Sequence, residues 1–553
     1  MKVSFSKWKS SGEPWVWINA GSVTVSLVMV FGLLALIAVK GLAHFWPGDL
    51  LAAQYMVNGK SMHLLGEEVE REEVAVEQLR TAGLEVDPSI ESHARVLLKI
   101  GNRDVGGFDF KWILEESLLD RQYPKDAIAI ERREWGNFYG YLLAVLEDGK
   151  EVAQGEESWQ ALQPRMTRAL AIHDEIYHTE KVEIGAVNAT LERARLRQRG
   201  YELDQALTPE RLAELAATRA EQDQIYQALQ SKLTDLYGQI QRDSIRVKTA
   251  DDKEITLPLA KLVRIYRPNQ MSTLDKLMFY ATKLGEFIGD DPREANTEGG
   301  IFPAIYGTVL MVIIMSLFVT PMGVVAAIYL REYAHQGTLT RIIRIAVNNL
   351  AGVPSIVYGV FGLGFFIYFL GAHIDDAFFQ EALPSPTFGT PGLLWASITL
   401  ALLTLPVVIV ATEEGLARIP RAMREGSLAL GATKVETLWK VVLPMASPAM
   451  MTGVILAIAR AAGEVAPLML VGVVKLAPSL PLDGNYPYLH LDQKFMHLGF
   501  HIYDVGFQSP NVEAARPLVY ATSLLLVIVI GLLNLSAVAL RNHLREKYKA
   551  LEM

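Results

Sequence analysis

Two ionisable residues interrupt a long apolar stretch in the second half of the chain. Arg460 and Glu464 lie within residues 441–474, four positions apart and therefore on one face of a predicted helix. Ionisable groups at membrane depth are costly, so they usually face a bundle interior or an aqueous path. A guanidinium matches the oxygens of a tetrahedral oxyanion, and a neighbouring carboxylate can hold it until an anion arrives. We interpret the pair as an anion-translocation site. The alternative is a structural ion pair that locks two spans together.

A polar segment just before this stretch is built like a short lever. Leu428 and Leu430 give its first half an apolar face that is available for docking, and Gly431 breaks the helix. A second helix is expected to end at Pro444, because proline does not continue a helix. The pattern predicts a helix–turn–helix elbow that couples the flanking spans to a neighbouring protein.

Two other patterns look like binding sites on first reading. His497 and His501 have the spacing of a helical zinc pair, but no third ligand is evident, so for these and His490 we favour a structural or interfacial role. Residues 58–61 read Asn-Gly-Lys-Ser and end like a phosphate-binding loop. The first glycine of that motif would fall at Gln54, so we interpret 58–61 as an ordinary turn. We find no nucleotide-binding signature elsewhere.

The elements that must position these residues follow from hydropathy. About half of the 553 residues are hydrophobic, and one in five is charged, which indicates two environments. A helix needs about 20 residues to cross the ~30 Å hydrocarbon layer of a membrane. Six apolar runs have this length: 21–39, 299–330, 345–370, 393–412, 441–474 and 517–540.

The distribution of Lys and Arg sets the orientation of these spans, because basic residues in short flanking segments stay in the cytoplasm. The loop 371–392, predicted to lie outside, has three acidic residues and no Lys or Arg. The run 21–39 is long for a removable signal peptide and lacks a clear cleavage site, so we interpret it as an uncleaved anchor. The basic segments predicted to face the cytoplasm are 2–9, 331–344, 413–440 and 541–549.

Residues 47–298 are too many and too polar for a loop, so they must form a domain. Their net charge is −13, against +4 for the rest of the chain, and an acidic surface would repel an anion. The chain has no cysteine, so this domain has no disulfides. Residues 165–241 have apolar positions three and four apart, as in an antiparallel coiled-coil hairpin. The flanks carry strand-like alternation, which makes the domain α+β, with strands expected at 94–100, 127–130, 141–146, 244–249 and 254–258.

The elbow resembles the signature of the membrane subunits of binding-protein-dependent ABC importers. That signature is Glu-Ala-Ala, three residues, glycine, nine residues and Ile-x-Leu-Pro. Here Glu425, Gly431 and the Val441, Leu443 and Pro444 group keep the spacing, while Gly-Ser replaces Ala-Ala after the glutamate. The resemblance implies that Glu425, Gly431, Leu443 and Pro444 couple the chain to an ATPase.

Three further stretches resemble the phosphate branch of this family, the PstA-like permeases. They are 300–304 with 327–333, 349–359 and 457–468, and the resemblance covers about 299–540 and the first span. It implies an importer of inorganic phosphate in the bacterial inner membrane. Sulfate, molybdate or another solute is an alternative cargo. A membrane-anchored sensor or scaffold acting through residues 47–298 is an alternative of another class.

The resulting prediction is a mainly α, polytopic membrane protein with six transmembrane helices and a large α+β/coiled-coil insertion outside. The resemblance implies a second permease, two ATPase subunits that bind ATP and Mg²⁺, and an external phosphate-binding protein. The chain itself binds no cofactor or metal and is not an enzyme. The predicted parts are a cytoplasmic N-terminus with anchor (1–46), a periplasmic domain (47–298), a permease core (299–541) with coupling loop 412–445, and a cytoplasmic tail (542–553).

Overall fold

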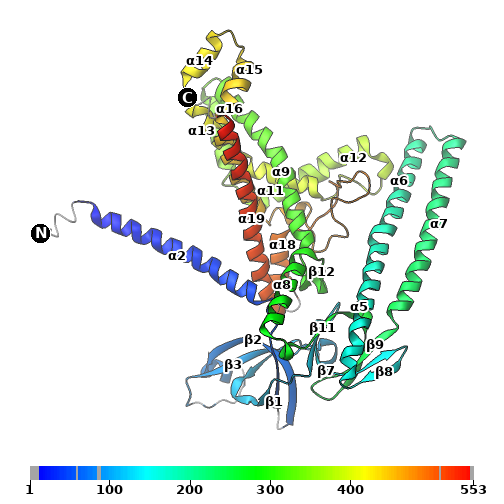
Figure 1. Ribbon diagram of the computed structural model, residues 1–553. Coiled ribbons are helices and arrows are strands. Elements are labelled where there is room, and N and C mark those ends of the chain that lie inside the picture. Colours follow the sequence, from blue (N-terminus) through cyan, green and yellow to red (C-terminus); the bar gives the residue numbers. More distant parts are fainter. Residues whose placement is uncertain are drawn as a thin grey trace.

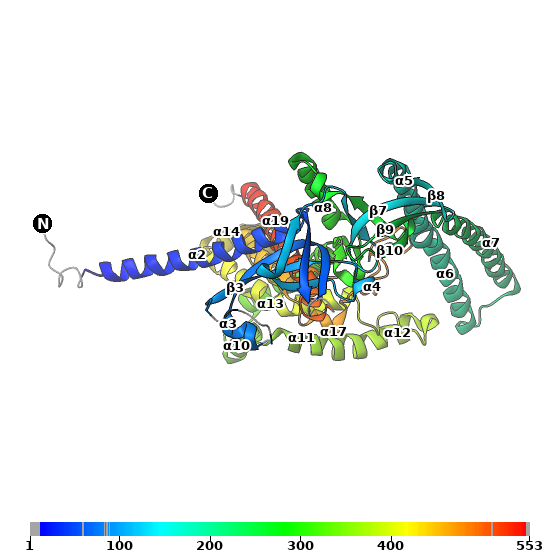
Figure 2. The ribbon, with the colours of Figure 1, turned by 90° about the horizontal axis from the view of Figure 1, so that it is seen from below.

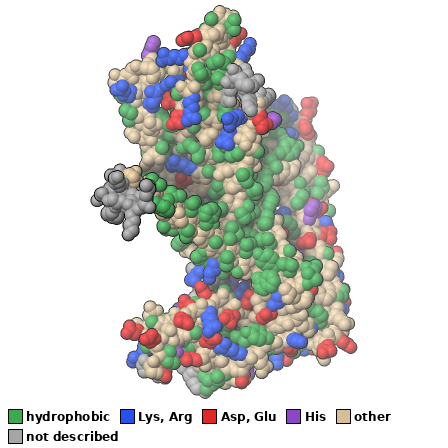
Figure 3. Space-filling view, turned by 60° about the vertical axis from the view of Figure 1, so that its left-hand side comes forward, with side chains coloured by type: hydrophobic (Ala, Val, Ile, Leu, Met, Phe, Trp, Pro, Cys, Tyr) green, Lys and Arg blue, Asp and Glu red, His purple; other side chains and the backbone are tan. Residues whose placement is uncertain are grey.

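The computed structural model describes residues 11–57, 60–81, 83, 87, 89–509 and 512–548. Lys2, Lys7, Lys9, Asn58 and Gly59, which carried parts of the predictions above, lie outside these residues. The molecule consists of a helical bundle with a sheet domain at one end (Figure 1). Figure 3 shows an apolar band over the bundle, with charged side chains gathered at both ends. This surface is what a membrane-spanning bundle requires, since lipid tails offer charged groups no solvation.

Six helices are long and apolar enough to cross a membrane, which confirms the predicted count for the described residues. Their boundaries differ from the prediction by the most at two places. The third span begins at Ser355 and not at 345, because Gly352 and Pro354 end the preceding helix. The fifth span covers Lys434–Gly463 and ends well before 474. The helices are α2 (Glu13–Ala43), α9 (Phe302–Ile328), α11 (Ser355–Phe361) continued by α12 (Ala372–Phe378), α13 (Leu393–Arg418), α16 (Leu443–Gly463) and α19 (Val512–Tyr548).

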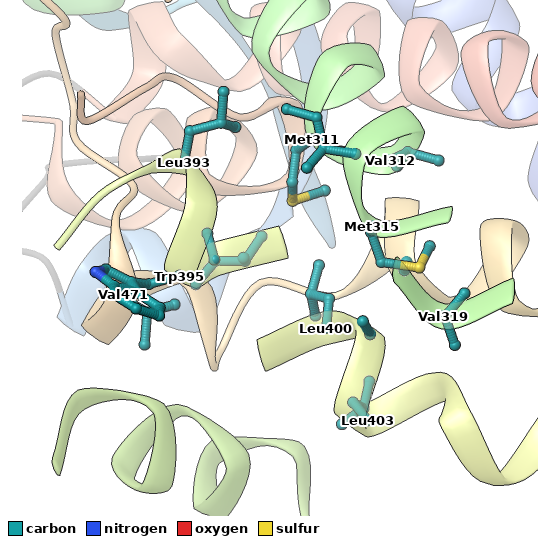
Figure 4. Close-up of a cluster of buried hydrophobic side chains, with 14 of the residues drawn as sticks. Met311, Val312, Met315, Val319, Leu393, Trp395, Leu400, Leu403 and Val471 are labelled. Carbon is teal, nitrogen blue, oxygen red and sulfur yellow. The ribbon is translucent and has the colours of Figure 1, made fainter. Parts of the chain in front are cut away.

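Helix α13 is the centre of the bundle and is its most buried span. Leu393, Trp395 and Leu400 on α13 meet Met311 and other side chains of α9 in the largest apolar cluster of the described residues (Figure 4). Val471 of the short helix α17 (Leu468–Val471) closes one side of that cluster. The neighbouring spans thus hold α13 through close side-chain packing, which positions the segments at both of its ends.

Helix α2 is bound to the bundle only near one end. At Gly41 a side chain would lie 2.9 Å from the backbone of Ala521, so α2 and α19 cross there with their backbones in contact. The hydropathic part of α2 is otherwise entirely exposed. In Figure 1 the helix points away from the bundle, so its apolar surface requires a lipid or protein environment.

The sheet domain contains two antiparallel sheets. One has the order β4-β3-β2-β1-β5, and the other has the order β10-β9-β7-β6-β11, with β8 paired to β7. The predicted strands near 94–100, 127–130, 141–146, 244–249 and 254–258 are present as β3, β6, β7, β9 and β10. The strands are β1 (Leu50–Val57), β2 (Lys60–Ala75), β3 (Ser92–Lys99), β4 (Phe110–Leu114), β5 (Leu118–Gln122), β6 (Ala127–Arg132), β7 (Phe138–Glu147), β8 (Lys150–Gln154), β9 (Asp243–Lys248), β10 (Glu254–Pro258) and β11 (Leu262–Tyr266).

A long helical hairpin leaves the second sheet. Helix α5 (Glu157–His178) continues through a π-helical turn into α6 (Ile184–Leu203), and α7 (Pro209–Ile240) returns beside them. Thr208 caps α7 by accepting a hydrogen bond from the Arg211 amide at 3.3 Å, and Pro209 occupies the first turn. Viewed from below, the hairpin lies on the side of the sheet domain opposite to α2 (Figure 2). Its α6 helix contacts the turn at Gln380–Ala382, in the loop after the third span.

Two helices flank the second span, and the first of them connects the sheet domain to the bundle. Helix α8 (Thr273–Gly289) starts at Ser272 with a capping box formed with Asp275. Its Phe287 packs with Phe45 after α2 and with Ile301 before α9. Beyond α9, a separate amphipathic helix α10 (Thr338–Leu350) occupies the residues that hydropathy assigned to the start of the third span.

Candidate functional site

The predicted elbow lies at the end of the bundle remote from the sheet domain (Figure 1). Helix α14 (Arg421–Ala429) is followed by Gly431 with φ of +89° and then by α15 (Lys434–Thr437). A left-handed backbone favours glycine, so this residue allows the turn to form. A side chain at Gly431 would meet no heavy atom within 4 Å, so the requirement is conformational and not steric.

The prediction that the second helix ends at Pro444 is wrong. Helix α15 continues through a π-helical turn (Leu438–Val442) directly into α16, and Pro444 lies in the first turn of α16. Proline has no amide hydrogen to donate, and the helix continues past it because the π-helical turn just before it shifts the hydrogen-bond pattern, with the Leu443 amide donating to the Leu438 carbonyl. Leu443 and Pro444 are half-buried, and Val442 before them packs against Leu416 of α13. The second arm of the elbow is therefore continuous with the fifth span.

Arg424 fastens α14 to the bundle. Its guanidinium donates to the carbonyl oxygens of Leu416 at 2.7 Å and Ile419 at 3.0 Å, and to Glu332 Oε1 at 2.9 Å. A second link joins the two arms of the elbow, where the hydroxyls of Ser427 and Thr437 lie 2.9 Å apart. Charge-assisted hydrogen bonds are about twice as strong as neutral ones, so Arg424 fixes the root of the elbow.

The tip of the elbow presents apolar side chains to its surroundings. Leu430 is 91% exposed and Trp439 is 71% exposed, with Leu428 and Val435 between them also exposed. Glu425 is exposed on the same short helix, where the described residues provide it with no ion pair or hydrogen bond. An exposed apolar cluster with a free carboxylate is suited to docking another protein.

Sequence reasoning did not identify the ion pairs that hold this region. The guanidinium of Arg344 in α10 donates hydrogen bonds of 3.1 to 3.3 Å to the carboxylate of Glu413 in α13. Arg424 forms an ion pair with Glu332. In the sequence, both arginines are only members of the basic segments 331–344 and 413–440 that set the orientation. Their partners lie 69 and 92 positions away in sequence, and no local spacing reveals such pairs.

Arg460 and Glu464 are brought together as predicted, but not on one continuous helix. Helix α16 ends at Gly463, and Glu464 has an extended backbone with φ of −82° and ψ of 131°. The side chains still meet, with 3.5 Å between Arg460 Nε and Glu464 Oε1. They are 33% and 21% exposed, so the pair lies at an open face of the span and is not sealed within the core.

Two of the stretches that resemble phosphate permeases meet beside this pair. Gly359 of α11 lies against Pro467, where a side chain would come within 2.7 Å of the proline Cα. Tyr358, in the same stretch as Gly359, donates its hydroxyl to the Leu350 carbonyl at 2.7 Å. The close approach of the 349–359 and 457–468 stretches thus positions the end of α16 and Arg460.

The three histidines lie at separate positions at the sheet-domain end of the bundle. His490 pairs with Asp483 at 2.9 Å, whereas His497 and His501 are buried. Burial lowers the pKa of both buried histidines to about 4, so they are neutral at pH 7. Within the described ranges, no group of three His, Asp or Glu side chains is placed to hold a metal ion.

Comparison with known proteins gives a consistent family. Residues 319–550 match the family described as "Binding-protein-dependent transport system inner membrane component". The phosphate transport system permease protein PstA 1 of Mycobacterium tuberculosis (strain CDC 1551 / Oshkosh) is 35% identical over 247 residues, which cover 44% of this chain and 71% of that protein. PstA of Mycobacterium leprae is 36% identical, over 44% of this chain and 71% of that protein.

A more distant relative and a solved structure extend the comparison. The probable phosphate transport system permease protein PstA of Methanocaldococcus jannaschii is 29% identical, over 43% of this chain and 74% of that protein. Among solved structures, a chain of the inward-facing MetNI methionine ABC transporter is 19% identical with a TM-score of 0.32. That match covers 44% of this chain and 94% of the other.

Proposed function

The chain belongs to the family of binding-protein-dependent transport system inner membrane components, and we infer from this premise that it is the permease subunit of an ABC importer for inorganic phosphate. The observation that carries the cargo assignment is the 35% identity to a phosphate permease over 71% of that protein. The chain is a transport subunit and not an enzyme. We assign ATP hydrolysis, with its ATP and Mg²⁺, to separate partner subunits.

The elbow is the element through which those partners act on this chain. Residues 412–445, with Glu425, Gly431, Leu443 and Pro444, provide the coupling loop in this proposal. The exposed Leu430 and Trp439 support it, since they give an ATPase subunit an apolar surface to bind. Because α15 runs into α16, closure of the ATPases would push the fifth span and change access to the pore.

Arg460 is the residue to which we assign contact with the anion in transit. Its guanidinium lies at an open face of the bundle and its one ion-pair partner in the described residues is Glu464. An arriving phosphate would compete with Glu464 for the hydrogen-bond donors of the Arg460 guanidinium. After the phosphate is released, the Glu464 carboxylate would pair with Arg460 again. Pairing with a second permease would enclose this face, and an external binding protein would deliver the anion.

The orientation belongs to the same proposal. The N- and C-termini and the elbow face the cytoplasm of a bacterial inner membrane, and residues 47–298 face the periplasm, where the α6–α7 hairpin acts as a coiled-coil module. The chain contains no cysteine, so single cysteines can be introduced without background. An impermeant maleimide should label Ser231→Cys in intact cells and Ala432→Cys only after permeabilisation. The reverse pattern would contradict this topology.

Uptake measurements test the cargo. Cells that lack their own high-affinity phosphate importer should regain uptake of labelled phosphate when this chain is expressed with its partner subunits. Uptake of labelled sulfate and of labelled molybdate is measured in parallel, each with an excess of the other anions as competitors. If the cells take up sulfate or molybdate and phosphate does not inhibit that uptake, the cargo would be that anion and not phosphate.

A further inference from the structure

A cavity of about 1000 Å³ lies where the sheet domain meets the bundle. We call it the junction cavity. Its walls come from the residues after α2, from β2 and β3, from α8 and from the start of α19. The volume is at the upper end of the range for sites that bind small molecules. Figure 3 shows the hollow between the apolar band and the charged domain, with Lys and Arg side chains at its rim.

One part of the junction cavity is apolar and faces the membrane. Trp46, Tyr280 and Tyr520 line it, and aromatic residues of these types concentrate where lipid tails meet headgroups. Helix α8 is amphipathic, and its Leu274 and Met278 are 66% and 64% exposed. A helix with such a face lies in the membrane interface. The cavity therefore opens at the depth of the lipid headgroups.

The opposite part is charged, with eight carboxylates and six basic side chains in the lining. Half of these groups are neutralised by ion pairs. Lys283 pairs with Glu131 and with Glu286, the latter at 3.4 Å, and Arg516 pairs with Glu70 at 3.5 Å. The surplus of carboxylates disfavours a ligand that is only anionic.

Charged residues of both signs in the described part of the wall are left without such pairs, and they include Lys40, Lys99 and Arg293 among the bases and Glu68 and Glu298 among the carboxylates. Among the described residues, neither Lys99 nor Glu298 has a hydrogen bond or an ion pair through its side chain. Enclosure in the cavity raises the pKa of the Glu298 carboxyl, and Lys99 and Arg293 oppose the rise while Glu131 adds to it. A bound cation would relieve the cost of ionising Glu298, and a bound anion would do the same for Lys99.

We propose that the junction cavity binds phosphatidylethanolamine from the membrane leaflet on the sheet domain's side. The lipid phosphate contacts Lys99, the ammonium donates hydrogen bonds to Glu298, and the tails follow the exposed faces of α2 and α8. A zwitterion fits a site that offers unpaired charges of both signs, and Lys99 and Glu298 are the pair chosen for the test. Phosphatidylcholine lacks N–H donors, and phosphatidylglycerol lacks the cation. The inference does not depend on which solute is transported.

The test is native mass spectrometry of the purified, delipidated full-length chain titrated with defined lipids. Phosphatidylethanolamine should bind with an affinity about tenfold or more above that for phosphatidylcholine or phosphatidylglycerol, because it alone makes both charge-assisted contacts. Glu298→Gln and Lys99→Gln should each lower its affinity by a similar factor. The matched controls, Glu221→Gln on α7 and Lys150→Gln on β8, are exposed and remote from the cavity and should bind as the unmodified chain does.

Three results would overturn the proposal. Equal affinity for phosphatidylethanolamine and phosphatidylcholine would exclude recognition of the amine. Glycerophosphoethanolamine, the headgroup without tails, should bind far more weakly than the lipid, and equal binding would assign the cavity to a soluble ligand. Unchanged lipid affinity in both cavity variants, with circular dichroism matching the unmodified chain, would place the lipid elsewhere. Lys99 is half-exposed on β3, so its variant provides the test even if Glu298→Gln misfolds.

Discussion

Arg460 is the only charged residue in α16 and lies at an open face of that helix. It is therefore the first residue to substitute in a test of the anion path. Arg460→Gln should lower phosphate uptake by about tenfold or more, since losing a charged hydrogen bond costs ~1.5–3 kcal/mol. Arg460→Lys keeps the charge but loses the planar fork, so partial uptake at best is expected. Uptake is normalised to the amount of membrane-inserted protein.

Glu464→Gln and the double variant separate transport from a structural lock. If the pair is a structural lock, Arg460→Gln and Glu464→Gln should lower uptake equally. If Arg460 contacts the substrate, Arg460→Gln should lower uptake more than Glu464→Gln. Normal uptake by Arg460→Gln, or full recovery in the double variant, would remove Arg460 from the anion path.

Buried histidines should make stability sensitive to acid. His44, His497 and His501 have pKa values lowered to about 4, chiefly by burial, and lysines near His44 and His501 add to the lowering. The unfolded chain takes up these protons near pH 6.5 and the folded chain only near pH 4, so stability is full above pH 6.5 and falls between these values. Each group can contribute ~3 kcal/mol to this loss.

His501→Leu tests this linkage at one site. Both ring nitrogens of His501 lack hydrogen-bond partners within the described residues, so an apolar side chain of similar size should cost little at pH 7.5. The fall in melting temperature from pH 7 to pH 5 should be smaller in the variant. An identical fall would show that His501 does not titrate on unfolding. His543→Leu, at the end of the last span, is the control.

At the scale of elements, the elbow depends on how its root is held. Arg424→Met should release α14 from the carbonyls of Leu416 and Ile419 and from Glu332, so the ATPases would run without driving transport. We expect uptake to fall about tenfold while ATP hydrolysis by the assembled complex persists, because a single charged contact is worth ~1.5–3 kcal/mol. Arg418→Met, an exposed neighbour, is the control. Tight coupling in the Arg424 variant would show that the root needs no such anchor.

The turn at Gly431 gives a graded test of the same element. A β-branched residue disfavours a φ of +89°, with a penalty of about 1–2 kcal/mol, whereas Asn enters the left-handed region more easily. Uptake should therefore decrease in the order Gly, Asn, Val, with the Val variant abolishing transport. Because nothing lies within 4 Å of the added Cβ, equal loss in both variants would indicate a contact with a partner subunit.

The elements that could be predicted are those with strong local signals. Six long apolar runs and the apolar spacing in residues 165–241 were sufficient to predict six spans and the hairpin. The 16-residue strand β2 was missed because six of the seven residues from Glu67 to Glu73 are charged, and charge runs look like loops. The start of the third span was misplaced because the apolar face of α10 continues the hydropathy of α11.

In the candidate site too, the residues with a local sequence signal could be predicted and those that depend on tertiary contacts could not. The spacing of Arg460 and Glu464 was visible in the sequence, and so was the glycine turn. The arginine at the root of the elbow and the junction cavity were not, because both depend on residues that only the tertiary fold brings together.

At the scale of the molecule, the hairpin can be removed without dismantling the sheets. Residues 184–231 contribute few buried side chains, and Glu183 lies 3.4 Å from Lys232 across the pair. Replacing 184–231 by a short Gly-Ser turn should change the melting temperature by only a few degrees, about what 1 kcal/mol does in a large chain. Basal phosphate uptake should persist if the hairpin is a docking or regulatory module.

The control for this deletion inserts the same Gly-Ser turn at Asp204–Leu207 and keeps the hairpin. Complete loss of uptake in a well-expressed, membrane-inserted deletion variant would instead make the hairpin part of the translocation machinery. In that case the hairpin would act on the membrane-spanning bundle through its contact with the Gln380–Ala382 turn.

The order of the sheets along the chain has a consequence for biosynthesis. Within the described residues, the two large sheets draw their strands from Leu50–Tyr266, ahead of the second span. The ribosome still has more than 250 residues to add when that region is complete, which takes on the order of tens of seconds. The sheet domain can therefore finish folding while tethered by α2 alone. The wall of the junction cavity from Arg516 to Tyr520 arrives last, so a lipid can enter before the final helix closes over it.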